Sequence, residues 1–182
     1  VSYDTAAFFR EFPMVDFVVR GEGEEAVVQL IERLRAVKLD KARAAEVSRL
    51  GSLPGVAMRR EDGSIDESTA VTVADFSQVP FAYREAEIEP IKERILYYET
   101  SRGCPFSCAY CLSSIDKSVR FRSLERVREE LSFFLNARVP QVKFVDRTFN
   151  CNREHALFIW NYIREHDNGV TNFHFEVAAD IM

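Results

Sequence analysis

Residues 99–112 read "ETSRGCPFSCAYCL" and hold three of the chain's four cysteines, at the spacing C-x-x-x-C-x-x-C. Three thiols in one short loop that also contains a glycine and a proline are unusual for a protein interior, where unligated cysteines occur singly. Closely spaced thiolates bind zinc or iron–sulfur clusters, or exchange disulfides. The stretch therefore raises the question of what Cys104, Cys108 and Cys111 hold.

The composition is that of a packed protein in a reducing compartment. Of the 182 residues, 47% are hydrophobic and 29% are charged, with a net charge of −5, a balance typical of globular proteins. No basic stripe for nucleic acid is present, no apolar run is long enough to span a membrane, and no secretion signal is visible. Crowded thiols without a disulfide pattern lead us to expect a cytoplasmic protein.

Residues 1–70 have the pattern of an α/β region. The apolar run "VDFVV" (residues 15–19) predicts a strand, and the apolar spacing that follows a glycine turn predicts an amphipathic helix. Acidic residues at the start of this helix argue against phosphate binding at Gly21 and Gly23. A second, weaker helix is predicted over residues 38–50. Asp62-Gly63 predicts a β-hairpin.

Residues 71–93 lose this periodicity and contain two prolines, which predicts a linker. Residues 94–182 then alternate strand and helix. Strands are predicted within 94–101, 142–146 and 173–178, separated by helices, the first of them capped by Ser123. Such alternation is typical of parallel βαβ units with right-handed crossovers.

Four interpretations of the three cysteines compete. A structural zinc site needs a fourth Cys or His at short spacing, and none follows Cys111. A redox dithiol at residues 108–111 leaves Cys104 without a role, and three unligated cysteines in one loop are improbable. An iron–sulfur cluster remains. Three ligands for four irons leave one iron open for a substrate or cofactor, as an open coordination site does in catalytic zinc centres.

The segment "CPFSCAYC" resembles the C-x-x-x-C-x-φ-C signature of the radical S-adenosylmethionine (SAM) enzymes, with Tyr110 at the aromatic position. The segments "YYETSRGCPFSCAYC", "VKFVDRTFN" and "FHFEVAADI" are similar to the branch in which a cobalamin-binding domain precedes the radical domain. The resemblance is good over residues 95–182. In the N-terminal third, "DFVVRGEGEEAVVQLI" looks more loosely like the last strand and helix of that cobalamin-binding domain.

This resemblance implies a fold, a set of cofactors and an activity. The fold is α/β: residues 94–182 begin a partial (β/α) barrel of parallel strands, and residues 1–70 form the tail of a Rossmann-like cobalamin-binding domain. Cys104, Cys108 and Cys111 would bind a 4Fe–4S cluster whose open iron is chelated by SAM. Reductive cleavage of SAM would then give a 5′-deoxyadenosyl radical, in a cobalamin-dependent methyl transfer or a related radical reaction.

The resemblance also assigns three cofactor-binding residues. These are Tyr110, Asp146 at the end of the second strand, where the family often has a Gly-Gly-Glu-like segment, and Glu176 on the third strand. We expect Arg120 and Arg122 to be solvated rather than ligands of SAM. Cys151 is expected to be a packing residue, and the three histidines, His155, His166 and His174, are expected to be exposed or hydrogen-bonded.

The family's upstream cobalamin motif D-x-H-x-x-G is absent from this sequence. Either this segment lies in residues outside this sequence, or this branch has lost it. We expect a fragment of a longer protein, and cobalamin would bind only in that longer protein. Expected partners are a small-molecule substrate and an electron donor such as flavodoxin or ferredoxin, without nucleic acid or membrane. The alternative function is a non-catalytic iron–sulfur or metal-binding module.

Overall fold

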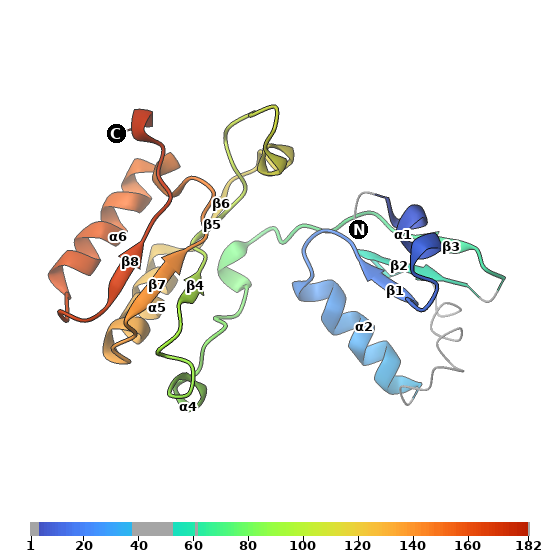
Figure 1. Ribbon diagram of the computed structural model, residues 1–182, viewed down its shortest axis with the longest axis horizontal. Coiled ribbons are helices and arrows are strands. Elements are labelled where there is room, and N and C mark those ends of the chain that lie inside the picture. Colours follow the sequence, from blue (N-terminus) through green and yellow to red (C-terminus); the bar gives the residue numbers. More distant parts are fainter. Residues whose placement is uncertain (1–3, 38–52, 61, 182) are drawn as a thin grey trace. The chain divides into compact units, whose positions relative to one another are not determined.

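The computed structural model describes residues 4–37, 53–60 and 62–181, and the chain divides into two compact units, Val1–Val73 and Ala74–Met182 (Figure 1). The helix predicted over residues 38–50 lies outside the described residues. Within the described part of the chain, no helix is long and apolar enough to cross a membrane.

The first unit combines two helices with a three-stranded sheet. Its elements are α1 (Thr5–Glu11), β1 (Phe17–Val19), α2 (Glu24–Ala36), β2 (Val56–Arg59) and β3 (Ile65–Glu67). The strand order is β1-β2-β3, with both pairs antiparallel. The predicted strand, helix and hairpin are confirmed, and Gly63 lies in the hairpin turn with φ +79°. This sheet differs from the parallel arrangement of a Rossmann-like domain, because the hairpin strand β2 is the described neighbour of β1.

The second unit is built on a parallel sheet. Its main elements are β4 (Leu96–Tyr98), α5 (Leu124–Asn136), β7 (Gln141–Phe144), α6 (Arg153–Glu165) and β8 (Asn172–His174). The strand order is β4-β7-β8, and both pairs are parallel. The predicted order of three strands and two helices is therefore confirmed, as is the cap of α5, whose first turn donates from Arg126 N to Ser123 Oγ.

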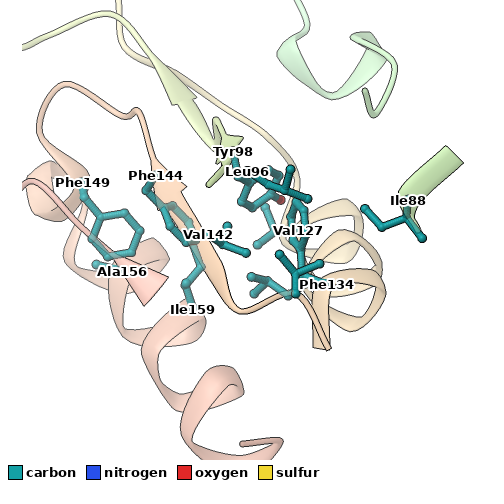
Figure 2. Packing of buried hydrophobic residues seen from close by; sticks show 12 residues of the cluster. Ile88, Leu96, Tyr98, Val127, Phe134, Val142, Phe144, Phe149, Ala156 and Ile159 are labelled. Carbon is teal, nitrogen blue, oxygen red and sulfur yellow. The ribbon is translucent and has the colours of Figure 1, made fainter. Parts of the chain in front are cut away.

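Helices α5 and α6 cover one face of this sheet. Figure 2 shows Phe134 of α5, Ile159 of α6 and Phe144 of β7 in one core cluster, and all three side chains are fully buried. Because side chains alternate along a strand, the register row Tyr97, Lys143 and His174 lies on the face without helices. The apolar face builds the core, and the polar face is left for other contacts.

The boundary between the two units, between Val73 and Ala74, falls within residues 71–93, the segment predicted as a linker. The start of this segment belongs to the first unit, where Val71 forms a β-bridge with Gly21. From residue 74 onward it belongs to the second unit, in which Phe76 is 1% exposed and Ile88 is part of the core. The short elements η2 (Phe76–Gln78) and α4 (Glu85–Ile88) lie in it. Burial of single apolar side chains, which needs no periodicity, holds this segment in place.

Tyr83 from the same segment binds the outer edge of β4. Its hydroxyl donates to Tyr97 O and accepts from Tyr97 N, both at 2.9 Å. The single phenol therefore satisfies the backbone donor and acceptor of a residue in an edge strand. Burial raises the pKa of Tyr83, so the hydroxyl keeps the proton that it donates.

His155, in the first turn of α6, departs from the expectation of an exposed or hydrogen-bonded histidine. The residue is 5% exposed, its ring centroid lies 5.0 Å from that of Phe121, and its Nε2 atom has no hydrogen-bond partner among the described residues. Burial lowers the pKa of His155 to about 4. The folded protein therefore holds this ring in its neutral form.

We predict that His155 sets part of the acid sensitivity of the fold. The unfolded chain takes up a proton below the ordinary pKa of about 6.5, whereas the folded chain does not until about pH 4. The free energy of unfolding should therefore fall as the pH falls through this window, by up to about 1.4 kcal/mol per pH unit. In His155→Phe this contribution disappears, so urea unfolding should depend less steeply on pH between 6.5 and 4.

A comparison at pH 8, where the ring is neutral in both states, gives the packing cost of the substitution alone. Equal pH slopes for the two proteins would contradict the prediction.

Candidate functional site

The three crowded cysteines lie in a loop that is closed at its base by a short ladder. Strand β5 (Ser101–Arg102) precedes the loop and pairs antiparallel with β6 (Arg120–Phe121), which follows it. The cysteine loop, residues 103–119, therefore leaves and returns at one place, directly after the carboxyl end of β4 (Figure 1). Sites on parallel α/β sheets lie at this end of the strands.

The first residue of the cysteine loop must be glycine. Gly103 has φ +101°, and a Cβ atom there would lie 2.5 Å from Ser118 O. The close approach lets Cys104 N donate to Asp116 O at 2.9 Å, and Asp116 in turn forms an ion pair with Arg120 at 2.8 Å. The loop base is thus fixed by backbone contacts on both sides.

The cysteines of the loop lie in three different environments. Cys104 is 7% exposed, with its Sγ atom 3.7 Å from Thr148 Oγ1, whereas Cys108 is exposed and Cys111 is half-buried. Cys111 N donates to Cys108 O at 3.2 Å, which forms a turn between them. Tyr110, within this turn, is 94% exposed.

In donor chemistry the loop fits an iron–sulfur cluster, since it offers three thiols. Their placement is a separate matter. Among the residues that the structure describes, no group of three His, Cys, Asp or Glu side chains is gathered as for a metal ion. The three sulfurs are therefore held in one loop without being drawn to one point.

Asp146, which follows β7, ties the end of β7 to the base of the cysteine loop. Its carboxylate accepts from Thr100 N at 3.1 Å, from Thr100 Oγ1 at 2.7 Å and from Ser101 Oγ at 2.6 Å. Asp146 is 1% exposed. Burial raises the pKa of this carboxyl, and the hydrogen bonds from Ser101 and Thr100 oppose that shift. The geometry is that of a residue that positions the loop, with its oxygens already engaged by protein donors.

Glu176 lies at the same end of the sheet but on the face without helices. Its side chain is 55% exposed and forms an ion pair with Lys143 of β7 at 3.3 Å. Its backbone is fixed, because Glu176 O accepts from Phe149 N at 3.0 Å. Of the two predicted acidic residues, only Glu176 therefore presents its carboxylate to solvent.

Asn150 is a site-forming residue that the sequence reasoning missed. Its side-chain amide donates to Ala178 O at 2.8 Å and accepts from Ala178 N at 2.9 Å, and the residue is 4% exposed. The amide thus pairs with both backbone groups of Ala178, as a neighbouring strand would, in the segment that carries Glu176. A polar residue in the segment that follows a strand is the sequence signal for such a clamp, and it also applies to Thr100 and Ser101.

The structure changes the expectation for Arg122 and leaves that for Cys151 as a prediction. Arg122 is not solvated: it is 5% exposed and forms an ion pair with Glu130 at 3.1 Å. Cys151 is half-buried, and its pKa is raised by burial and by the nearby Asp146 and Cys104. Cys151 is thus near enough to Cys104 for the pKa of its thiol to be affected, although 47 positions separate them in the numbering.

Comparisons with known proteins agree on one group of enzymes. An uncharacterised methyltransferase of Pyrococcus horikoshii is 31% identical over 163 residues, which are 87% of this chain and 34% of that protein. The cobalamin-dependent radical SAM methyltransferase TokK of Streptomyces tokunonensis is 27% identical over 152 residues, 78% of this chain and 21% of that protein. No protein-family model matches the chain.

Among solved structures, the cobalamin-dependent S-adenosylmethionine radical enzyme OxsB, with aqua-cobalamin and S-adenosylmethionine bound, matches with a TM-score of 0.69. The match has 23% identity and covers 98% of this chain and 25% of the OxsB chain. At this identity the match concerns the fold alone. The chain spans about a third or less of the length of these three proteins.

We predict that Asp146→Ala destabilises the fold by about 3 kcal/mol, because it leaves buried donors of Thr100 and Ser101 without an acceptor. Urea unfolding measures the effect. Ser101→Ala should cost about 1 kcal/mol in the original chain and close to nothing when Asp146 is already alanine. Equal costs of Ser101→Ala in the two backgrounds would show that the two side chains are not coupled.

We also predict that Gly103→Ala loosens the cysteine loop selectively. The substitution combines a strained positive φ with a backbone clash, so the amide of Cys104 should lose its protection against hydrogen exchange. Gly169→Ala is the matched control in the same unit, since Gly169 has φ +68° and a Cβ atom added there would meet nothing within 4 Å. The control should cost only about 1 kcal/mol of backbone strain. A Cys104 amide equally protected in both variants would refute the role of Gly103.

Proposed function

Since the chain belongs to the radical SAM enzymes, in the branch with a cobalamin-binding domain, we propose that it binds a 4Fe–4S cluster through Cys104, Cys108 and Cys111 and contributes to the reductive cleavage of SAM. The observation that carries this proposal is the closed loop with three thiols at the carboxyl end of a parallel sheet. The relatives support the family, whereas the reaction of the whole protein is part of the proposal.

The cluster would supply the electron that breaks the S–C5′ bond of SAM, with methionine and a 5′-deoxyadenosyl radical as products. The residues of this chain bind and position. The three thiolates would hold the cluster, while Gly103 and Asp146 fix the loop base. We propose Glu176 as a contact for the ribose or amino group of SAM, because its carboxylate is accessible and its backbone is fixed.

Tyr110 is proposed as a contact of SAM on family grounds, and its 94% exposed ring is available for that role. Asp146 is better suited to an indirect role. Its oxygens are occupied by Thr100 and Ser101, so it would act on SAM through the position of the loop.

We further propose that residues 94–182 begin a partial (β/α) barrel, which additional strands of a longer protein would complete. Residues 1–70 would be the tail of its cobalamin-binding domain, and cobalamin would bind in the longer protein only. A cytoplasmic methyl transfer or related radical reaction on a small molecule fits the methyltransferase activities for which the relatives are named. An electron donor such as flavodoxin or ferredoxin would reduce the cluster.

We predict that anaerobic reconstitution with iron and sulfide loads about four irons per chain. Single substitutions of Cys104, Cys108 and Cys111 by alanine should abolish the cluster absorbance, because a cube with two remaining thiolates is not retained. Cys151→Ala is the matched control and should keep its iron. Full iron content in Cys108→Ala, or complete loss in Cys151→Ala, would overturn the assignment.

Formation of 5′-deoxyadenosine separates the enzyme from a non-catalytic cluster module. The full-length protein, reconstituted and reduced with dithionite, should convert SAM to 5′-deoxyadenosine and methionine. A loaded protein that neither cleaves SAM nor changes its electron paramagnetic resonance spectrum when SAM is added would favour the module.

A further inference from the structure

We propose that Phe76 is a positioning residue for the cysteine loop, acting through two arginines at the base of that loop. The identity of the group that the loop binds rests on the proposed function, whereas the effect of Phe76 on the loop does not. The position of Phe76 in a segment without helical or strand periodicity gives no sign of this role, and the role follows from its contacts in the second unit.

The aromatic ring of Phe76 lies under two guanidinium groups. The Cζ atom of Arg102 is 4.7 Å from the ring centroid, and that of Arg122 is 4.9 Å from it. Phe76 is 1% exposed, and cation–π attraction is strongest when the contact is removed from water. One ring therefore contacts two side chains at the loop base, that of Arg102 at the end of β5 and that of Arg122 directly after β6.

Each guanidinium also has its own carboxylate. Arg102 donates to Glu99 at 2.8 Å, and Arg122 donates to Glu130 at 3.1 Å. These pairs neutralise the two positive charges, so that both can approach one ring without net repulsion. Glu130 also accepts from the hydroxyl of Tyr98 at 2.8 Å, which extends the network to β4.

Backbone contacts join the Phe76 segment to the same ladder. Arg122 donates through its side chain to Val79 O at 2.8 Å and through its backbone to Thr100 O at 2.8 Å. In addition, Ser123 N donates to Ser77 Oγ at 2.8 Å. Residues 76–79 are thus bonded to the chain where it leaves the cysteine loop.

Arg102 leads directly into Gly103 and Cys104, and Arg122 follows β6, where the loop closes. A shift of either guanidinium would therefore be passed to the ladder that holds the loop ends together. Apolar burial of Phe76 alone would stabilise the unit as a whole. A ring under two arginines restricts the loop base in particular.

The test compares Phe76→Leu with Phe134→Leu in the 182-residue chain. Both replace a fully buried ring by an aliphatic side chain, but only the first removes the contacts with Arg102 and Arg122. Hydrogen exchange of residues 100–122 is measured without cluster, and iron content is measured after reconstitution. For Phe76→Leu we expect about tenfold faster exchange in this segment, with the rest of the second unit unchanged.

Phe134→Leu should instead raise exchange across the whole unit without preference for the loop base. Phe76→Ala should show the loop effect of Phe76→Leu together with a larger loss of global stability. Unchanged exchange of residues 100–122 in Phe76→Leu, or the same distributed pattern in both leucine variants, would overturn the proposal. Because exchange is read without cluster, this outcome is independent of whether the loop binds iron or the protein cleaves SAM.

Discussion

The architecture of the site depends on the few residues that follow strand β7. The buried carboxylate of Asp146 accepts hydrogen bonds from the segment that follows β4. The buried amide of Asn150 forms hydrogen bonds with the segment that follows β8. The central strand of the sheet thus fixes both of its neighbours at the carboxyl end, where the ladder of β4, β7 and β8 has ended. Without these side chains, buried backbone groups on both flanks would lack partners.

Two kinds of contact then converge on the cysteine loop. From the sheet side, Asp146 binds Thr100 and Ser101 just before the loop begins. From a segment earlier in the sequence, Phe76 contacts the arginines at both of its ends. Gly103 allows the tight turn at the start of the loop, and the three thiols lie in the loop that follows. The loop is held at its base, and its cysteines keep three different degrees of exposure.

Much of the fold could be predicted from periodicity. The parallel strands, helices α5 and α6, the Ser123 cap and the hairpin at Gly63 all follow from local patterns. The three cysteines were found because their spacing is itself the signal. The packing of residues 74–93 in the second unit could not be predicted from periodicity, since Phe76 and Tyr83 pack singly and without period. The burial of Arg122 could not be predicted either, because its partner Glu130 lies on a helix that only the tertiary fold brings near.

The phenol of Tyr83 protects one edge of the parallel sheet. On the β4 side, Tyr97 has already given its backbone donor and acceptor to a side chain of the same unit, so an incoming strand would first have to displace a packed ring. On the β8 side, the described sheet ends in a strand with one partner. Pairing with a strand of another copy is thereby disfavoured on the β4 side, where one hydroxyl group protects the edge of the sheet.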